Sequence, residues 1–181
     1  MKNKKILVAL TVAACLCTVV LAVINASFGV MLTPMTDNLL PDTDASAEQG
    51  YPNSAMQISS FISVVALLFI GGKINKSVIL SVSSAAIAIV MIILGTGPSF
   101  IVFVALFLII GLAFGATDVL SSSLIADLYG AKSTSMMCIL HACHGSAGMA
   151  APFVLTAVLS SSDKWSAPYT AVGILSAAVL L

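Results

Sequence analysis

Residues 101–126, IVFVALFLIIGLAFGATDVLSSSLIA, form a predominantly apolar run with a single charged residue, Asp118. A helix of about 20 apolar residues crosses the hydrocarbon core of a bilayer, so this stretch predicts a membrane-spanning helix. Asp118 is also the only charged residue between positions 77 and 126. A carboxyl group in hydrocarbon costs several kcal/mol unless it faces a polar cavity, which makes Asp118 a candidate functional residue.

The composition of the whole chain is that of a membrane protein. Of its 181 residues, 60% are hydrophobic and only 8% are charged, and the mean hydropathy is +1.15. A soluble domain carries about 25% charged residues, so a soluble fold is excluded. The seven basic residues are all lysines and form no basic patch, and no phosphate-binding glycine loop is present. We therefore expect no nucleic-acid partner and no cofactor.

Further apolar runs predict an all-α membrane protein, a polytopic helical bundle that forms a single transmembrane domain over residues 1–181. The predicted spans are residues 6–34, 54–72, 77–95, 101–126, 133–160 and 168–181. Most of them are near or above the length that crosses a bilayer, whereas the last is too short to cross unaided. We expect five full transmembrane helices and a truncated sixth, with the chain cut inside that helix.

The lysines predict the orientation of the bundle. Six of them lie at alternate ends of successive spans: Lys2, Lys4, Lys5, Lys73, Lys76 and Lys132. The opposite ends carry mostly acids: Asp37, Asp42, Asp44, Glu48 and Asp163, with Lys164 beside the last. Because positive charge stays on the cytoplasmic side, we expect a cytoplasmic N-terminus in a multi-pass protein of the cell (plasma or inner) membrane. The connector of residues 36–53 then becomes a flexible outer loop.

A signal peptide is the alternative interpretation of the N-terminus. Lysines followed by an apolar stretch, and the residues VAAC at 12–15, resemble a lipoprotein cleavage site. The apolar run continues well past Cys15, however, and further spans follow, which favours a first transmembrane helix. Cys17, Cys138 and Cys143 also lie within predicted spans, where cysteine behaves as a small apolar residue rather than as part of a disulfide framework.

Small and polar residues share one face of the fourth span. Gly111, Gly115, Asp118 and Ser122 fall within about 60° of one another at 100° per residue. Gly111 and Gly115 also form a GxxxG motif, whose simpler interpretation is close helix packing. For Asp118 the alternative is a buried acid that bonds to a neighbouring hydroxyl group for purely structural reasons.

The fifth span carries a second such face. His141, Gly145, Gly148 and Pro152 lie on one side of it, and the glycines and the proline are candidates for helix packing. We expect His141 and Asp118 to lie at one depth, each about 13 Å from the cytoplasmic end of its span. A carboxyl group near an imidazole can exchange a proton, as a proton-coupled carrier needs. The alternative is that His141 only bonds a neighbouring helix.

A transition-metal site is a further interpretation of this span, because Cys138, His141 and His144 carry ligand atoms that suit zinc or copper. Histidines three residues apart on a helix converge only partly, and a helical CxxH pattern arises easily by chance. We therefore expect no metal.

These motifs resemble a known family, because the chain is similar to the N-terminal half of a major facilitator superfamily transporter of the fucose-permease-like branch. The fifth span resembles the pattern L-H-x-x-F-G-x-G-x-x-x-G-P of that branch. It matches the pattern at Leu140, His141, Gly145 and Pro152 and departs from it at His144, Ala147 and Ala151.

Two other places carry the resemblance. The fourth span is similar to G-x-x-[DE]-x-x-x-N at Gly115 and Asp118, with Ser122 in place of asparagine. Residues 71–76, GGKINK, are similar to the cytoplasmic loop G-x-L-x-D-R-x-G-R at Gly71. Asn75 replaces the aspartate of that loop, and Lys76 is the basic residue beside it.

The resemblance implies a secondary active transporter, a symporter that moves a sugar or another small polar solute with a proton or sodium ion by alternating access. It implies a solute path lined by Asn25, Asp118, Ser122 and His141, with Asp118 and His141 coupling the ion, and a gating loop at Gly71, Asn75 and Lys76. The first span has Asn25 where proton-coupled sugar carriers of the branch often have an acid. Alternating access also needs a second bundle, either a missing C-terminal half or a second copy.

Two other classes of function compete with transport. A non-transporting membrane scaffold would pair with a partner through the GxxxG face of the fourth span. A membrane-embedded enzyme would need a nucleophile at helical spacing from His141 and Asp118, or a full set of metal ligands, and the sequence supplies neither. We therefore expect no enzymatic activity.

Overall fold

The computed structural model describes residues 2–41 and 47–179, and the part described is all-α with no strand. Six α-helices follow one another within these described residues: α1 (Lys2–Leu39), α2 (Tyr51–Ile70), α3 (Lys76–Leu94), α4 (Phe100–Tyr129), α5 (Ser133–Ser160) and α6 (Ala167–Val179). Three 3₁₀ turns lie between them: η1 (Glu48–Gly50), η2 (Gly71–Lys73) and η3 (Gly130–Lys132).

The first two helices are longer than the apolar runs predicted. Helix α1 continues through Pro34 to Leu39. Helix α2 starts at Tyr51, because Pro52 fits the first turn of a helix, where its missing N–H is not needed. The predicted outer loop of residues 36–53 is therefore shorter at both ends. Asp42 and Asp44 in this loop lie outside the described residues, as do the last two residues of the predicted sixth span.

Four helical stretches are long and apolar enough to cross a membrane, which indicates a membrane protein. They are Lys4–Leu39, Glu48–Lys73, Lys76–Leu94 and Phe100–Ser160. The last stretch contains both α4 and α5, which meet at the turn η3, where Gly130 has a φ of 49°. Helix α6 is also apolar but shorter.

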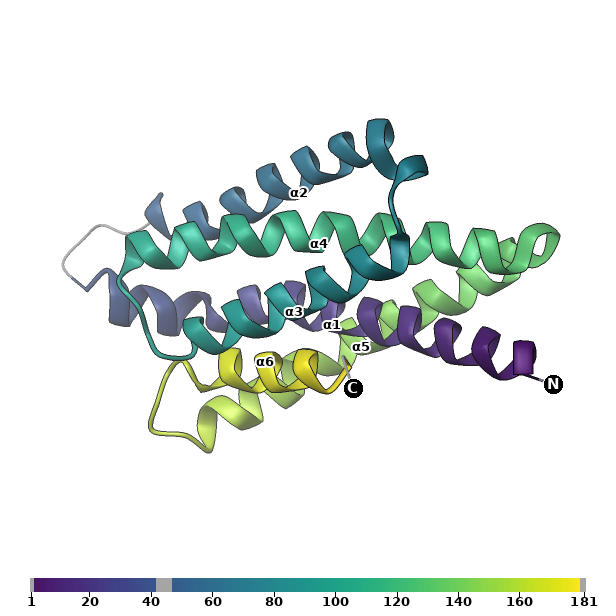
Figure 1. Cartoon of the computed structure of the whole chain (residues 1–181). Helices are drawn as coiled ribbons and strands as arrows, with labels where there is room; N and C mark the ends of the chain where they lie inside the picture. Colours follow the sequence, from purple (N-terminus) through teal and green to yellow (C-terminus); the bar gives the residue numbers. More distant parts are fainter. Residues whose placement is uncertain (1, 42–46, 180–181) are drawn as a thin grey trace.

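The helices form two layers (Figure 1). One layer is the row α2–α4–α1–α5, in which each helix packs against the next. Helices α3 and α6 pack against each other and form the second layer, α3 lying against α4 and α6 against α1 and α5. We call the side of the row that points away from α3 and α6 the open face, because no described element covers it.

The core lies between the two layers. Its largest fully buried side chains come from α1, α2, α3, α4 and α6 and include Met31, Met91, Phe103, Phe107 and Tyr169. The rings of Phe103 and Phe107 stack with centroids 5.0 Å apart, and the ring of Tyr169 meets that of Phe103 edge-on at 5.5 Å. This aromatic contact ties α6 to α4 near the end where α4 begins.

Helices α2 and α4 approach each other very closely. A Cβ atom added to Gly111 would lie 2.1 Å from the main-chain oxygen of Met56, and one added to Gly115 would lie 2.5 Å from that of Ser60. Only glycine permits this backbone approach. The GxxxG motif of α4 thus packs against α2 of the same chain.

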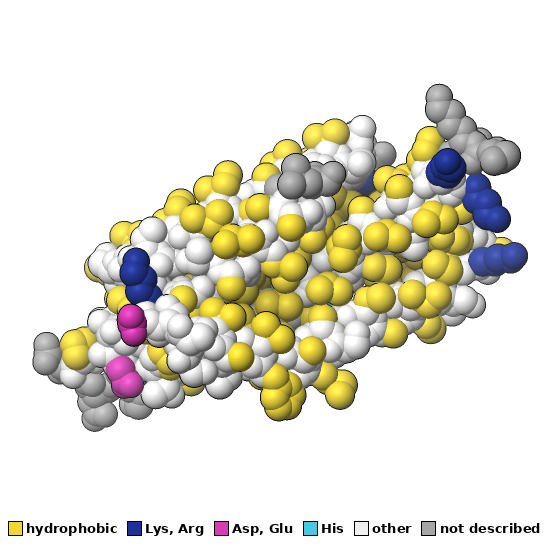
Figure 2. Space-filling view, turned by 90° about the horizontal axis from the view of Figure 1, so that it is seen from below, with side chains coloured by type: hydrophobic (Ala, Val, Ile, Leu, Met, Phe, Trp, Pro, Cys, Tyr) yellow, Lys and Arg dark blue, Asp and Glu magenta, His cyan; other side chains and the backbone are white. Residues whose placement is uncertain are grey.

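Charge is divided between the two ends of the bundle. Figure 2 shows dark-blue lysine side chains gathered at the end where the N-terminus lies, whereas the magenta acidic side chains, with a further dark-blue group, lie at the opposite end. Hydrophobic side chains are spread over the visible face between the two ends, as lipid contact requires.

Candidate functional site

Asp118 is exposed on the open face of the bundle. Its neighbours Ala116 and Leu120 are buried against Leu80 of α3. Residues two apart on a helix point about 160° apart, so the carboxyl group of Asp118 lies on the side of α4 away from α3. Asp118 makes no hydrogen bond or ion pair with another residue of the described chain. The acid is therefore uncompensated within this bundle.

His141 is exposed on the same face, on α5. The side of α5 that turns toward α6 is marked by Ala147 and Val154, which line an apolar groove together with Val172 of α6. At 100° per residue, His141 and Gly145 point away from that groove and hence toward the open face. His141 and Gly145 share one face of α5, as their spacing predicts, and the packing leaves this face uncovered.

Asn25 is exposed on α1, which lies between α4 and α5 in the row. Phe28 contacts Phe107 of α4, with ring centroids 6.4 Å apart, and Ala22 contacts Gly148 of α5. Asn25 lies between these two directions around the helix, so it points outward between α4 and α5.

A hydrogen bond fixes the relative depth of the helices. Nδ1 of His144 on α5 lies 3.0 Å from the main-chain oxygen of Thr18 on α1. Cys17 of α1 and Thr117 of α4 line one small internal cavity. Because successive helical residues differ in height by about 1.5 Å, Asp118 lies near the height of His144.

His141 lies one turn of α5 from His144, which is about 4.5 Å along the helix axis. The open face thus carries a carboxyl group on α4 and an imidazole on α5 at similar depth, with α1 between them. Asn25 lies about 10 Å further toward the other end of the bundle, since it is seven residues beyond Thr18.

His144 forms an interhelical hydrogen bond that its position in the sequence did not predict. A carbonyl oxygen can only accept a hydrogen bond, so Nδ1 of His144 carries the proton and, in the neutral ring, Nε2 is an acceptor. The helical angle of 60° between His144 and the predicted face was a signal that this ring turns toward a neighbouring helix.

Three residues of α4 near Asp118 carry hydroxyl groups: Thr117, Ser121 and Ser122. Ser122 is half-buried, one turn after Asp118. Thr117 and Ser121 are buried, and their hydroxyl groups find no hydrogen-bond partner within the described chain. These two hydroxyl groups face the interior, so of this set Ser122 stands nearest to the open face.

The predicted gating loop starts α3. The side chain of Asn75 accepts hydrogen bonds from the main-chain nitrogens of Ser77 and Val78 and so caps the helix. Nζ of Lys76 donates to Oγ of Ser123 at 2.7 Å and pairs with the carboxylate of Asp127 on α4. Gly71 lies in the turn before these residues, with open space around its Cα.

The pairing of Lys76 with Asp127 was missed by sequence reasoning. Asp127 follows the apolar run of residues 101–126, at the end of the bundle where Lys76 lies. It is the only salt bridge within the described chain. The ion pair joins the start of α3 to the end of α4.

The glycines of α5 differ from those of α4. A Cβ atom added to Gly145 would meet nothing within 4 Å, and one added to Gly148 would touch only Ala22, at 3.9 Å. Pro152 is half-buried inside α5. Gly145 therefore makes no close helix contact with the described chain.

Metal-ligand chemistry finds no support in the geometry. No group of three or more His, Cys, Asp or Glu side chains that could hold a metal ion occurs within residues 2–41 and 47–179. Cys138 and His141 are exposed, and His144 turns toward α1.

Comparison with known proteins gives no family for the chain. No protein-family model matches it, and no curated protein matches it.

Proposed function

We propose that the chain is half of a secondary active transporter, which moves a small polar solute, such as a sugar, together with a proton or sodium ion by alternating access. The observation that carries this proposal is the exposure of Asp118, an acid in the middle of an apolar helix, on the open face. An acid at that depth in lipid costs several kcal/mol, so a polar cavity must lie in front of it.

The other polar groups of the open face support the same proposal. Asn25, Ser122 and His141 offer an amide, a hydroxyl and an imidazole, which are the groups that bind the hydroxyls of a sugar. His141 lies near the depth of Asp118 on the other side of α1, so water or solute in the cavity would carry a proton between the two groups. We assign Asp118 and His141 to ion coupling, and all four residues to the solute path.

A second bundle is part of the proposal. The open face has polar groups but no cover from the described chain, and a midplane site needs protein on both sides. The cover is a C-terminal half of the transporter or a second copy of the chain. Rocking of the two bundles would open the site to each side of the membrane in turn.

The proposed topology has a cytoplasmic N-terminus. The stretch Phe100–Ser160 counts as two crossings because α4 and α5 reverse at Gly130, which gives five full spans followed by the shorter α6. The lysines at the ends of α1, α3 and α5 then lie on the cytoplasmic side. The membrane is the plasma or inner membrane of the cell.

The competing proposal, a scaffold that pairs through GxxxG, meets an obstacle in the packing. Gly111 and Gly115 are already covered by α2, whose main-chain oxygens lie where a partner helix would have to enter. That glycine face is not free for another chain.

Reconstituted vesicles test the proposal. We would reconstitute the chain into proteoliposomes, alone and together with a C-terminal half. A proton or sodium gradient is then imposed across the vesicle membrane, and the uptake of radiolabelled fucose, galactose and glucose is measured. Gradient-driven accumulation that is lost in Asp118→Asn and kept in Asp163→Asn, an exposed acid in the α5–α6 loop, is the expected result. Accumulation that survives Asp118→Asn would remove this acid from the coupling mechanism.

A further inference from the structure

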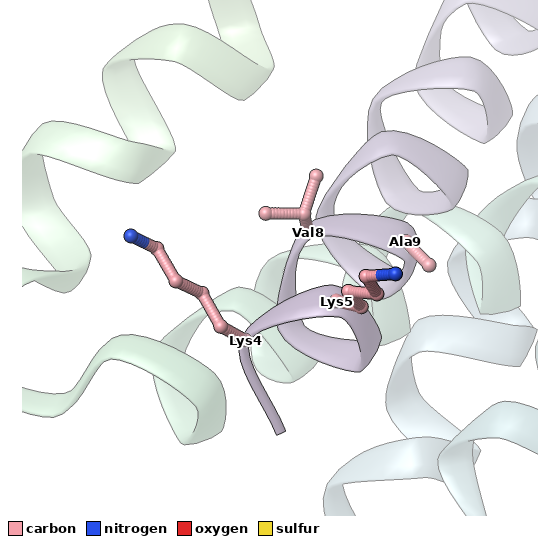
Figure 3. A pocket seen from close by; sticks show the side chains of 4 residues that line it. All are labelled: Lys4, Lys5, Val8 and Ala9. Atoms are coloured by element: carbon pink, nitrogen blue, oxygen red, sulfur yellow. The ribbon is translucent and has the colours of Figure 1, made fainter. Parts of the chain in front are cut away.

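The first turns of α1 form a shallow cavity of about 490 Å³, lined by Lys4, Lys5, Val8 and Ala9. Figure 3 shows the two lysine side chains leaving α1 in opposite directions, with Val8 and Ala9 about one turn further along the helix. Its wall is almost entirely apolar, because the lysines contribute their methylene stems and hold their ammonium groups at the rim. The cavity thus combines positive charge with hydrophobic surface.

The two ammonium groups are not neutralised by the described chain. Lys4 and Lys5 are exposed, and neither makes an ion pair or a hydrogen bond with another described residue. Lys76, at the same end of the bundle, differs because Asp127 and Ser123 hold it. The charge of Lys4 and Lys5 is therefore available to an external anion.

An apolar stripe continues from the cavity along α1. Val8, Val12 and Leu16 follow one another at four-residue spacing, and their side chains are 53%, 51% and 42% exposed. Residues at this spacing lie above one another on one side of a helix, so the stripe is about 12 Å long. Ile6 adds a further exposed side chain at the start of α1.

We propose that this cavity binds an anionic phospholipid. The ammonium groups of Lys4 and Lys5 attract the anionic headgroup from opposite sides of the cavity, and an acyl chain lies along Val8, Val12 and Leu16. Anionic lipid surfaces attract lysines, and each lysine strengthens the attraction about fivefold. A zwitterionic lipid with the same acyl chains gains the apolar contact but not the charge.

This binding does not depend on the transport activity proposed above. It requires only that the end of α1 lies at the headgroup level of a membrane, with Val8 deeper than the lysines. Loss of transport in a variant of Asp118 would leave the lipid site intact, and loss of the lipid site would leave the assignment of Asp118 untouched.

Native mass spectrometry of the purified full chain tests the site. The chain is titrated with phosphatidylglycerol and, separately, with phosphatidylcholine of the same acyl chains. We expect phosphatidylglycerol to bind more tightly, and the double variant Lys4→Gln/Lys5→Gln to bind it about 25-fold more weakly. The charge-retaining variant Lys4→Arg/Lys5→Arg should bind as the parent does. Added salt should weaken binding, since exposed charges are screened.

The matched control is Lys73→Gln/Lys132→Gln, which removes two exposed lysines at the same end but outside the cavity. We expect this control to retain phosphatidylglycerol. Equal binding of the two lipids to the parent chain, or an equal loss of phosphatidylglycerol binding in both double glutamine variants, would overturn the proposal. Lys4 and Lys5 would then contribute only to the orientation of the chain in the membrane.

Discussion

Nδ1 of His144 on α5 donates a hydrogen bond to the main-chain oxygen of Thr18 on α1, over 3.0 Å. This bond joins the two helices near the height of Asp118 and fixes the tautomer of the ring. His141, one turn earlier on the same helix, is exposed on the open face instead. Two histidines of one helix therefore differ: His144 bonds to a neighbouring helix, whereas His141 is exposed.

Substitution of each histidine by alanine should have a different effect. His144→Ala should destabilise the bundle by about 1 kcal/mol, because it removes an interhelical hydrogen bond in a membrane-spanning segment. His141→Ala should leave stability unchanged and lower gradient-driven uptake. Thermal unfolding in detergent and uptake in vesicles measure the two effects. Equal stability losses in both variants would contradict the assignment.

Close packing of α2 against α4 predicts a large effect at Gly111. Gly111→Ala should destabilise the chain by about 1–3 kcal/mol, because the new methyl group meets the main-chain oxygen of Met56 and the helices must separate. Gly145→Ala on α5 is the control and should be neutral or slightly stabilising, since nothing lies within 4 Å of its added atom. Denaturation in detergent compares the two; a neutral Gly111→Ala would show that α2 is not held as described.

The ion pair of Lys76 with Asp127 predicts a small, salt-dependent coupling. The side chain of Asp127 is 60% exposed and that of Lys76 is 23% exposed, so the pair should contribute less than about 1 kcal/mol. A double-mutant cycle of Lys76→Gln and Asp127→Asn, measured at low and high salt, determines this coupling. A coupling that is unchanged by salt would mean that the pair is more shielded than its exposure indicates.

Removal of the lone acid should leave the fold intact. Asp118→Asn should not lower the melting temperature of the purified chain, because the carboxyl group has no partner within the described residues and faces outward. In a bilayer the neutral side chain should, if anything, improve stability, since a charge no longer has to be accommodated. Parallel unfolding of the parent and the variant in detergent checks this, and a marked loss would reveal a structural role for Asp118.

Much of the fold followed from local chemistry. Long apolar runs interrupted by lysines, Gly130 and Pro52 specify apolar helices and their ends, because a backbone in hydrocarbon must satisfy its own hydrogen bonds. The helical class and the placement of Asp118 inside an apolar helix were accessible in this way. The start of α2 was predicted three residues late, since the apolar run does not include the proline turn that begins the helix.

The amino-acid pattern alone predicts a set of apolar helices with Asp118 in the middle of one of them, because hydrophobic length and helical period are properties of a single segment. Only the tertiary structure decided which side of each helix is covered. Packing of α2 occupies Gly111 and Gly115, the bond to Thr18 turns His144 inward, and α3 and α6 leave Asp118 and His141 on the uncovered side. These outcomes depend on contacts between segments far apart in the chain, which no local pattern encodes.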